Sequence, residues 1–222
     1  GYAMREHQSP TRTRRKGWAA VSAATASVLI SIPFVFGGAA QASSLVDVTV
    51  TIADLTYDGG TTAEITDCTI DTPVGGFDVS CDASGASGDF VSEDVATGVL
   101  VTVTGLMLIG GDSADFEIDG ITATGDIVPA ELTATAATAD SRDYDGTDDA
   151  TISDCTLDAV VEGDTVTCSG TGTFDTKDSG TGKTVTVDSL SLGGTDAGNY
   201  TISSTYPTGV TADITAIDIT VD

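Results

Sequence analysis

Several carboxylates surround a predicted turn in the second half of the chain. Asp143, Asp145, Asp148 and Asp149 fall within the run Asp-Tyr-Asp-Gly-Thr-Asp-Asp. Because calcium prefers carboxylate and other oxygen ligands, these four residues form a candidate weak calcium site. Turn residues on a solvated acidic face explain the same pattern without any ligand. A related stretch earlier in the chain has fewer aspartates, so a calcium site would not be common to both halves.

The chain has few residues that could carry out nucleophilic catalysis. The single His, His7, and the single Trp, Trp18, both lie in the first 42 residues, so Ser-His and Cys-His catalysis are excluded downstream. Paired carboxylates serve glycosidases, but here the acidic residues are spread along every predicted loop. We therefore expect no enzymatic activity, no catalytic residue and no bound cofactor other than the candidate calcium.

A glycine-lysine segment at residues 179–184 imitates the end of a phosphate-binding loop. The earlier glycine that such a loop needs is replaced by Lys177. The segment that follows is predicted as a strand, whereas a phosphate site needs the amino end of a helix. Nucleotide binding is therefore not expected.

The chain contains an internal repeat. A Tyr-Asp-Gly triplet at residues 57–59 recurs at 144–146, and Cys68 and Cys81 recur as Cys155 and Cys168, all 87 positions apart. The spacing shortens to 84 after a three-residue difference in the region 84–90, and it returns to 87 near the end of each copy. The sequence thus predicts two copies of one module.

The four cysteines are predicted to form disulfides, because the first 42 residues have the pattern of a secretory signal, which would deliver the chain to an oxidising compartment. Three pairings are possible, and the repeat favours Cys68 with Cys81 and Cys155 with Cys168. On the chain-entropy estimate each closed loop stabilises the fold by roughly 3 kcal/mol. Each bond is expected to tie the two arms of one hairpin.

Residues 1–42 are predicted to be a secretory signal peptide. A basic stretch at 12–16 precedes an apolar run that ends at Phe36, and Ala40-Gln41-Ala42 forms a cleavage site of the small-residue type. The alternative is an uncleaved membrane anchor, because residues 18–36 are just long enough to span a bilayer. Either way we expect a secreted or cell-surface location.

The charge balance limits the partners. The chain has 8 Lys and Arg against 34 Asp and Glu; without residues 1–42, 3 basic and 33 acidic residues remain. Such a chain repels nucleic acid and anionic lipid. We expect no nucleic-acid partner, and membrane contact only through an uncleaved leader.

The pattern of the remaining chain is that of short strands. Apolar residues alternate with polar ones from Val46 to Ile52, turn signals recur at regular intervals, and helical periodicity is absent. The prediction is an all-β chain of two tandem Ig-like β-sandwich repeats, residues 43–129 and 130–216, with 217–222 as the start of a further strand or a terminal tail. In both copies the apolar phase slips by one residue, between Val103 and Leu106 and between Val187 and Leu190, which predicts a bulge.

The second copy resembles the YDG-type repeat of bacterial surface proteins and adhesins. The resemblance covers nearly all of residues 131–216 and, more loosely, 45–130. It implies a β-rich stalk or spacer and brings no catalytic residues. The first copy departs from it, with Asp115-Phe116 where Asn-Tyr is usual. The residues that carry it are Tyr-Asp-Gly at 144–146, Gly-Asp-x-Val at 163–166, Gly-x-Gly-x-Phe at 170–174, Gly-Lys-x-Val-x-Val at 182–187, Leu-x-Leu-x-Gly at 190–194 and Asp-Ala-Gly-Asn-Tyr at 196–200.

Aromatic residues at repeat positions, Tyr57, Tyr144, Phe174 and Tyr200, are expected to pack in cores or turns rather than to form a ligand platform. Asn199 begins a formal glycosylation acceptor, but the Asn-Tyr step of the YDG-type repeat explains it better as a packing residue. Outward rows of Thr hydroxyls on the strands leave glycan or ice binding open.

Taken together, the sequence predicts a non-enzymatic extracellular repeat protein that acts as a spacer or stalk of a surface or secreted assembly. Its partners would be itself or other surface proteins. The first alternative is a filament subunit, in which residues 45–52 or 217–221 add as a strand to an open sheet edge of a neighbouring copy. The second alternative is a calcium- or glycan-binding module.

Overall fold

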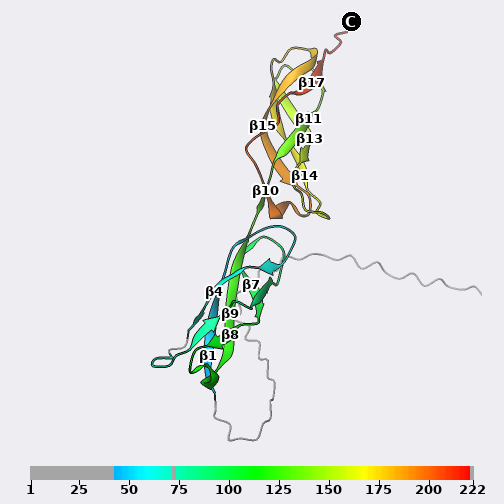
Figure 1. The fold of residues 1–222 in the computed structure, drawn as a ribbon. Coiled ribbons are helices and arrows are strands. Elements are labelled where there is room, and N and C mark those ends of the chain that lie inside the picture. Colours follow the sequence, from blue (N-terminus) through cyan, green and yellow to red (C-terminus); the bar gives the residue numbers. More distant parts are fainter. Residues whose placement is uncertain (1–42, 72–73, 221–222) are drawn as a thin grey trace, which may run out of the picture.

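The computed structural model describes residues 43–71 and 74–220, which form two β-rich bodies that follow one another lengthwise (Figure 1). Following the repeat, residues 43–129 are called the first module and residues 130–216 the second. The predicted signal peptide, residues 1–42, lies outside the described residues. No helix in the described part of the chain is long or apolar enough to cross a membrane.

The first module consists of nine strands and one 3-10 turn, and most of its strands belong to a single sheet. The sheet order is β3-β6-β7-β9-β1-β4, with β2 also paired to β9. The central pair is parallel, because Ser44 to Thr51 of β1 lie beside Phe116 to Thr124 of β9. The elements are β1 (Ser44–Ile52), β2 (Leu55–Thr56), β3 (Thr62–Ala63), β4 (Ile65–Ile70), β5 (Ser80–Asp82), β6 (Ser87–Phe90), β7 (Ala96–Thr104), β8 (Met107–Ile109), η1 (Ser113–Asp115) and β9 (Phe116–Val128).

The second module repeats this arrangement with some strands longer and others divided in two. Its main sheet has the order β11-β13-β14-β15-β17-β12, and a separate parallel pair joins β10 to β16. The elements are β10 (Ala130–Leu132), β11 (Ala134–Ala139), β12 (Arg142–Asp143), β13 (Asp149–Leu157), β14 (Thr167–Phe174), β15 (Gly180–Gly193), η2 (Ala197–Asn199), β16 (Tyr200–Ile202) and β17 (Val210–Thr215).

The all-β prediction is confirmed, and the strand pairing shows how each sheet closes. In the first module β3 and β4 lie at opposite edges of the sheet although only Glu64 separates them, so the sheet curls around its own core. In the second module β11 and β17 lie close together and curl the sheet in the same way. An Ig-like sandwich would instead pack two separate sheets face to face.

The bulge predicted from the slipped apolar phase is present in the second module. There Thr171 pairs with Ser189 and Gly172 pairs with Val187, so Asp188 is the extra residue of β15. In the first module the strand breaks at the matching place, between the end of β7 at Thr104 and the start of β8 at Met107. The slip is thus accommodated by one inserted residue or by a break between two strands.

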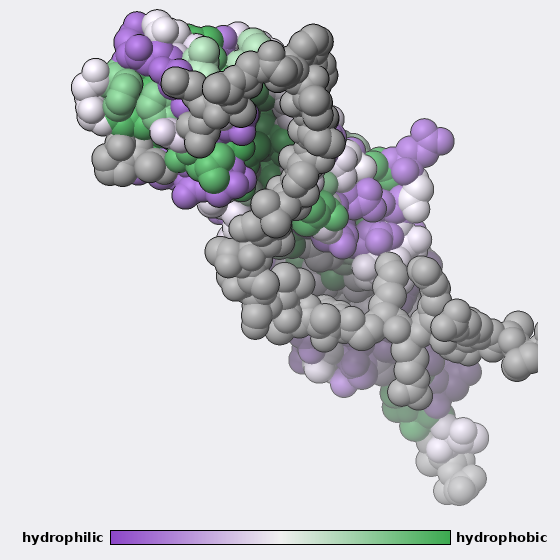
Figure 2. All heavy atoms as spheres, turned by 90° about the horizontal axis from the view of Figure 1, so that it is seen from below, coloured by the Kyte–Doolittle hydropathy of each residue, from purple (hydrophilic) through white to green (hydrophobic). Residues whose placement is uncertain are grey.

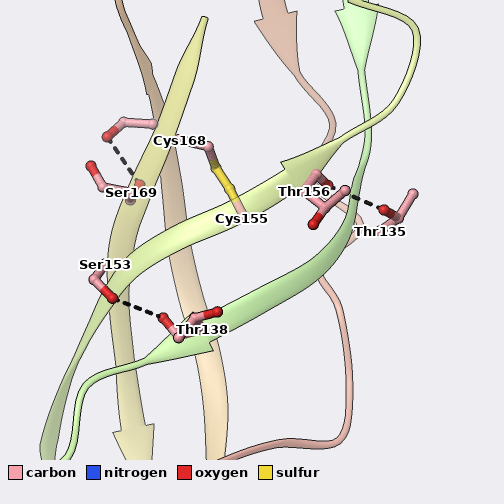
Figure 3. Close-up of a disulfide and its surroundings, with 8 residues drawn as sticks. Thr135, Thr138, Ser153, Cys155, Thr156, Cys168 and Ser169 are labelled. Atoms are coloured by element: carbon pink, nitrogen blue, oxygen red, sulfur yellow. Dashed lines mark hydrogen bonds between the residues drawn. A yellow bond between two sulfur atoms is a disulfide. The ribbon is translucent and has the colours of Figure 1, made fainter.

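The structure contains both predicted disulfides, Cys68–Cys81 and Cys155–Cys168, with Cα–Cα separations of 5.8 and 5.4 Å. The second joins β13 to β14, beside side-chain hydrogen bonds from Thr135 and Ser153 to neighbouring strands (Figure 3). The first does not tie a hairpin as expected. β5 pairs with β8 instead of β4, so Cys68–Cys81 links the main sheet to a separate two-stranded one.

The tail after the second module is not a strand in the described residues. Ile217 and Ile219 lie outside any strand and are 54 % and 83 % exposed. Residues 221 and 222, the end of the predicted further strand, lie outside the described residues.

Candidate functional site

The Tyr-Asp-Gly triplet builds the same turn in both modules. In each, the aspartate side chain accepts a hydrogen bond from the backbone N–H two residues later, at Gly60 in the first module (2.8 Å) and Thr147 in the second (2.9 Å). The tyrosine N–H also donates to the last strand of its own module, from Tyr57 to the carbonyl of Val128 and from Tyr144 to that of Thr215. The triplet therefore fixes the direction of the tyrosine side chain at the C-terminal end of each module.

Tyr57 projects from the first module into the second. Its ring packs edge-to-face on the ring of Tyr200, with centroids 5.2 Å apart and an interplanar angle of 80°. Its hydroxyl donates to Oδ2 of Asp164 at 2.9 Å, and the Tyr200 hydroxyl donates to the same oxygen at 2.5 Å. The backbone N–H of Val161 in turn donates to the Tyr200 hydroxyl at 3.0 Å. One carboxylate thus holds a tyrosine from each module.

The surroundings of the two hydroxyls favour their protonated form. Burial raises the pKa of Tyr57 above the ordinary value of tyrosine, and the hydrogen bond to the Asp164 carboxylate and its charge add to the rise. Burial, followed by the Asp164 hydrogen bond, also raises the pKa of Tyr200. Both tyrosines therefore remain hydrogen-bond donors at neutral pH.

A second set of contacts between the modules comes from Asn199. Its side chain is only 7 % exposed. Its Oδ1 accepts the backbone N–H of Val95 at 3.0 Å, and its Nδ2 donates to Asp94 of the first module at 3.4 Å. The burial supports the predicted packing role of the Asn-Tyr step, which turns both side chains of that step towards the preceding module.

The modules also meet through apolar contacts. Gly59, at a φ of +77°, approaches Val161 so closely that a Cβ there would lie 2.8 Å from Cγ1 of the valine. The core of the first module continues across the boundary, since one buried cluster includes Ile127 as well as Leu132 and Tyr200. These apolar residues, together with the polar contacts of Tyr57, Asp164, Tyr200 and Asn199, are called the joint. The joint thus combines close apolar packing with hydrogen bonds between the two modules.

The structure does not gather the predicted calcium ligands into one cluster. Among the described residues no three His, Cys, Asp or Glu side chains converge as metal ligands would. Asp145 forms an ion pair with Arg142 and accepts from Thr147, contacts that lower its pKa to about 2, with the Thr147 backbone N–H the largest cause. Asp145 and Asp149 line one open hollow, and Asp143 and Asp148 do not.

Arg142 organises this acidic turn. Its guanidinium donates to the carbonyl oxygens of Thr147 at 2.7 Å and Asp149 at 3.0 Å. It also lies over the ring of Phe174, 5.5 Å from the centroid. The arginine therefore places a positive charge beside the Asp145 carboxylate and binds the backbone carbonyl oxygens of the turn.

The glycine-lysine segment lies at the start of β15, as the strand prediction required, and not at a helix. Lys183 forms an ion pair with Asp175 at 2.9 Å, which lowers the pKa of that carboxyl group. The lysine thus closes a turn within its own module.

Many of the other acidic residues act as acceptors for backbone N–H groups at matched positions of the repeat. Asp126 accepts from Gly98 and Asp213 from Gly182, both at 2.7 Å. Asp112 accepts from Asp78 and Asp196 from Thr165, both at 2.8 Å. Part of the acidic composition is therefore required by the fold itself.

Sequence reasoning named Tyr57, Asn199 and Tyr200 as packing residues but did not place them together, and it missed Asp164. One signal in the repeat could have found it. Asp164 corresponds to Phe77 of the first copy, while Tyr200 corresponds to Phe116. The first module therefore lacks both the carboxylate of Asp164 and the hydroxyl of Tyr200, and has a phenylalanine at each position.

Comparison with known proteins gives one match. No curated protein and no solved structure matches the chain. Residues 128–208 match the family described as YDG domain. This range contains the Tyr-Asp-Gly turn at 144–146 and the three side chains through which the second module makes polar contacts in the joint, Asp164, Asn199 and Tyr200. Residues 128–208, most of which belong to the second module, are therefore similar to the YDG domain family.

Proposed function

We propose that the chain is a non-enzymatic structural protein outside the cell, in which two tandem repeats act as a stiff spacer or stalk of a surface or secreted assembly. The observation that carries this proposal is the joint. A spacer must transmit orientation from one module to the next, and here Tyr57, Asp164 and Tyr200 close a hydrogen-bonded contact on a continuous core. The two disulfides and the acidic exterior suit such a role in an oxidising, aqueous setting.

Small-angle X-ray scattering of dilute protein tests the spacer role. The unchanged chain should scatter as one elongated particle of fixed length. Asp164→Ala should broaden the distribution of lengths, because it removes the acceptor of both tyrosine hydroxyls, and hydrogen bonds to charged groups contribute about 1.5–3 kcal/mol each. Asp119→Ala, which removes the same charge from an exposed position of β9, is the matched control and should leave the curve unchanged.

A flexible particle in the unchanged chain would contradict the spacer role. So would identical scattering curves for Asp164→Ala and the unchanged protein. Circular dichroism of each variant would establish that the modules themselves remain folded.

A filament subunit joined by strand addition is a second candidate, favoured by the exposed Ile217 and Ile219 in the tail. The other proposed donor, residues 45–52, belongs to β1, which is paired on both sides by β9 and β4. Only the tail is therefore available to such a filament, and its removal should abolish assembly seen by electron microscopy. A calcium- or glycan-binding role remains a third proposal, for which exposed hydroxyls such as Thr171 and Ser189 would be the glycan contacts.

A further inference from the structure

The two modules differ systematically in their exposed surfaces. Every large hydrophobic side chain that is exposed in the described range 43–216 belongs to the first module. At five of these positions the second module has a polar residue or glycine, whereas Leu45 matches Leu132, which is buried. Asp164 stands for Phe77, Asp175 for Val91, Thr184 for Leu100, Ser191 for Met107 and Gly193 for Ile109.

The one aromatic residue among these exposed side chains lies at the N-terminal end of the first module. Phe77 is 55 % exposed and packs edge-to-face on Phe116, with centroids 5.3 Å apart. Phe116 pairs with Ser44 at the start of β1, and the neighbouring Leu45 is also 55 % exposed. Figure 2 looks at the molecule from below Figure 1, onto this end, and shows hydrophobic residues among the polar ones on the near body.

This end corresponds, residue for residue, to the surface of the second module that receives the first. Phe116 stands for Tyr200, Phe77 for Asp164, Asp115 for Asn199 and Val74 for Val161. In the second module these positions contact the first module; they are Tyr200, Asp164, Asn199 and Val161. In the first module no described residue of a preceding module covers them.

The C-terminal end of the second module is the matching counterpart. Tyr144 stands for Tyr57 and is only partly buried, against the core of its own module. Gly146 stands for Gly59, and a Cβ placed on Gly146 would meet nothing within 4 Å, whereas Gly59 is in contact with Val161. This end therefore repeats the Tyr-Asp-Gly turn of the first module's half of the joint, and no described atom beyond the neighbouring residues lies within 4 Å of a Cβ placed on Gly146.

The charges at the two ends match in part, because Lys177 is opposite in charge to Asp115 whereas Asp178, which stands for Asp94, has the same charge as Asp115. The loop whose residues Asp94 and Val95 contact Asn199 becomes Asp178 and Ser179 in the second module, and the preceding Glu93 becomes Lys177. At the opposite end Asn199 becomes Asp115. Lys177 is exposed and forms no ion pair with the described residues. At the C-terminal end of the second module, the cation Lys177 stands where the first module has the anion Glu93. At the N-terminal end of the first module, the carboxylate of Asp115 stands where the second module has the amide of Asn199.

We propose that copies of this chain dock head to tail, with the C-terminal end of one second module seated on the N-terminal end of the next copy's first module. Tyr144 packs on Phe77 and Phe116, Val74 approaches Gly146, and Lys177 pairs with Asp115. The contact is heterologous, so it propagates instead of closing as a symmetric dimer. This docking extends the proposed spacer role. Its geometry is inferred from the joint between the two modules of one chain.

The experiment uses the chain from residue 43 on, the predicted product of signal cleavage, in analytical ultracentrifugation over a range of concentrations. The unchanged chain should form an open series of oligomers as concentration rises. Phe77→Ser and Tyr144→Ser should each weaken association roughly tenfold or more, the loss expected for an aromatic residue at the centre of an interface. Leu100→Ser, at an exposed position in the middle of β7, is the control and should associate normally.

Mixing the two variants gives the sharpest result. Each retains one intact end, so an equimolar mixture should form a heterodimer and nothing longer. Lys177→Glu, an exposed change that leaves both cores intact, should also weaken association. Mixing Lys177→Glu with Asp115→Lys should restore it, because the reversed pair and the unchanged pair can both form between the two variants. Circular dichroism checks the fold of every variant.

A single monomeric species at every concentration would overturn the proposal and leave the rigid spacer standing, because the scattering test is made on dilute monomer. Normal association of both aromatic variants would also overturn it. If removal of residues 217–222 abolished assembly while Phe77→Ser did not, strand addition would replace end-to-end docking.

Discussion

At the scale of single residues, the chain uses carboxylates mainly as hydrogen-bond acceptors. Asp58 and Asp145 close turns, Asp126 and Asp213 hold glycine N–H groups, and Asp164 binds two tyrosine hydroxyls. Asp164 differs from the others because its partners come from different modules. Tyr57 and Tyr200 donate to Asp164 only while their hydroxyls are protonated. Ionisation of either tyrosine would therefore weaken the contact between the two modules.

The raised pKa values of Tyr57 and Tyr200 predict a pH limit for the joint. Because both lie above the ordinary value of about 10, the joint keeps its full contribution below about pH 10 and loses it as pH rises through the raised pKa values. Ultraviolet absorption of tyrosinate, measured on the unchanged chain and on Tyr57→Phe and Tyr200→Phe, should assign two late ionisations to these residues.

Asp164→Asn should make both ionisations occur at lower pH, because the carboxylate no longer opposes a neighbouring negative charge. Ionisation of Tyr57 and Tyr200 at an unshifted value near 10 would show that the joint does not shield them.

At the scale of elements, the short strands β2 and β12 are fixed by side-chain contacts that differ between the modules. β12 contains only two residues, and Arg142 fixes it to the following turn and to the ring of Phe174. The first module has Leu55 at the position of Arg142 and lacks the ion pair. The second module therefore depends on a polar clasp where the first uses an apolar contact.

Arg142→Met should destabilise the second module by about 1–3 kcal/mol, since it removes charged hydrogen bonds and a cation–π contact while keeping much of the apolar stem. Arg142→Lys should recover only part of the loss, because an ammonium group cannot reproduce the planar fork of donors. Urea unfolding measures both. Equal stabilities for Arg142→Met and the unchanged chain would show that the turn holds without its arginine.

Local patterns were sufficient to predict several elements. Period-two alternation located β1, the repeat gave the disulfide pairing, and the slipped apolar phase gave the bulge at Asp188. The curled sheets were not predicted, because they depend on the parallel pairing of β1 with β9, strands that lie far apart in the sequence. Pairing partners over such separations are not encoded in the period of either strand.

The joint escaped prediction for a related reason. Tyr57 and Asp164 are 107 positions apart, and Asp164 is one of 33 acidic residues after position 42 with no local feature that marks it. The tyrosines were recognised only as members of a repeat. A comparison of the two copies for paired differences, Phe77 with Asp164 and Phe116 with Tyr200, contains the missing information.

At the scale of the whole molecule, the joint makes two curled modules into one elongated body (Figure 1). Tyr57, Asp164 and Tyr200 meet between the modules, Asn199 holds the backbone of Val95, and the apolar core passes through the same region. In the proposed spacer, stiffness would therefore depend on a few side chains at the boundary and not on the sheets alone.

Residual dipolar couplings of backbone amides measure this stiffness directly, because they report the orientation of each module in one weakly aligned sample. We expect the couplings of residues 43–71 and 74–128 and those of residues 130–215 to fit a single alignment tensor. Asp164→Ala should separate them into two tensors of different magnitude. Two different tensors in the unchanged chain would contradict a rigid joint and, with it, the proposed role as a spacer.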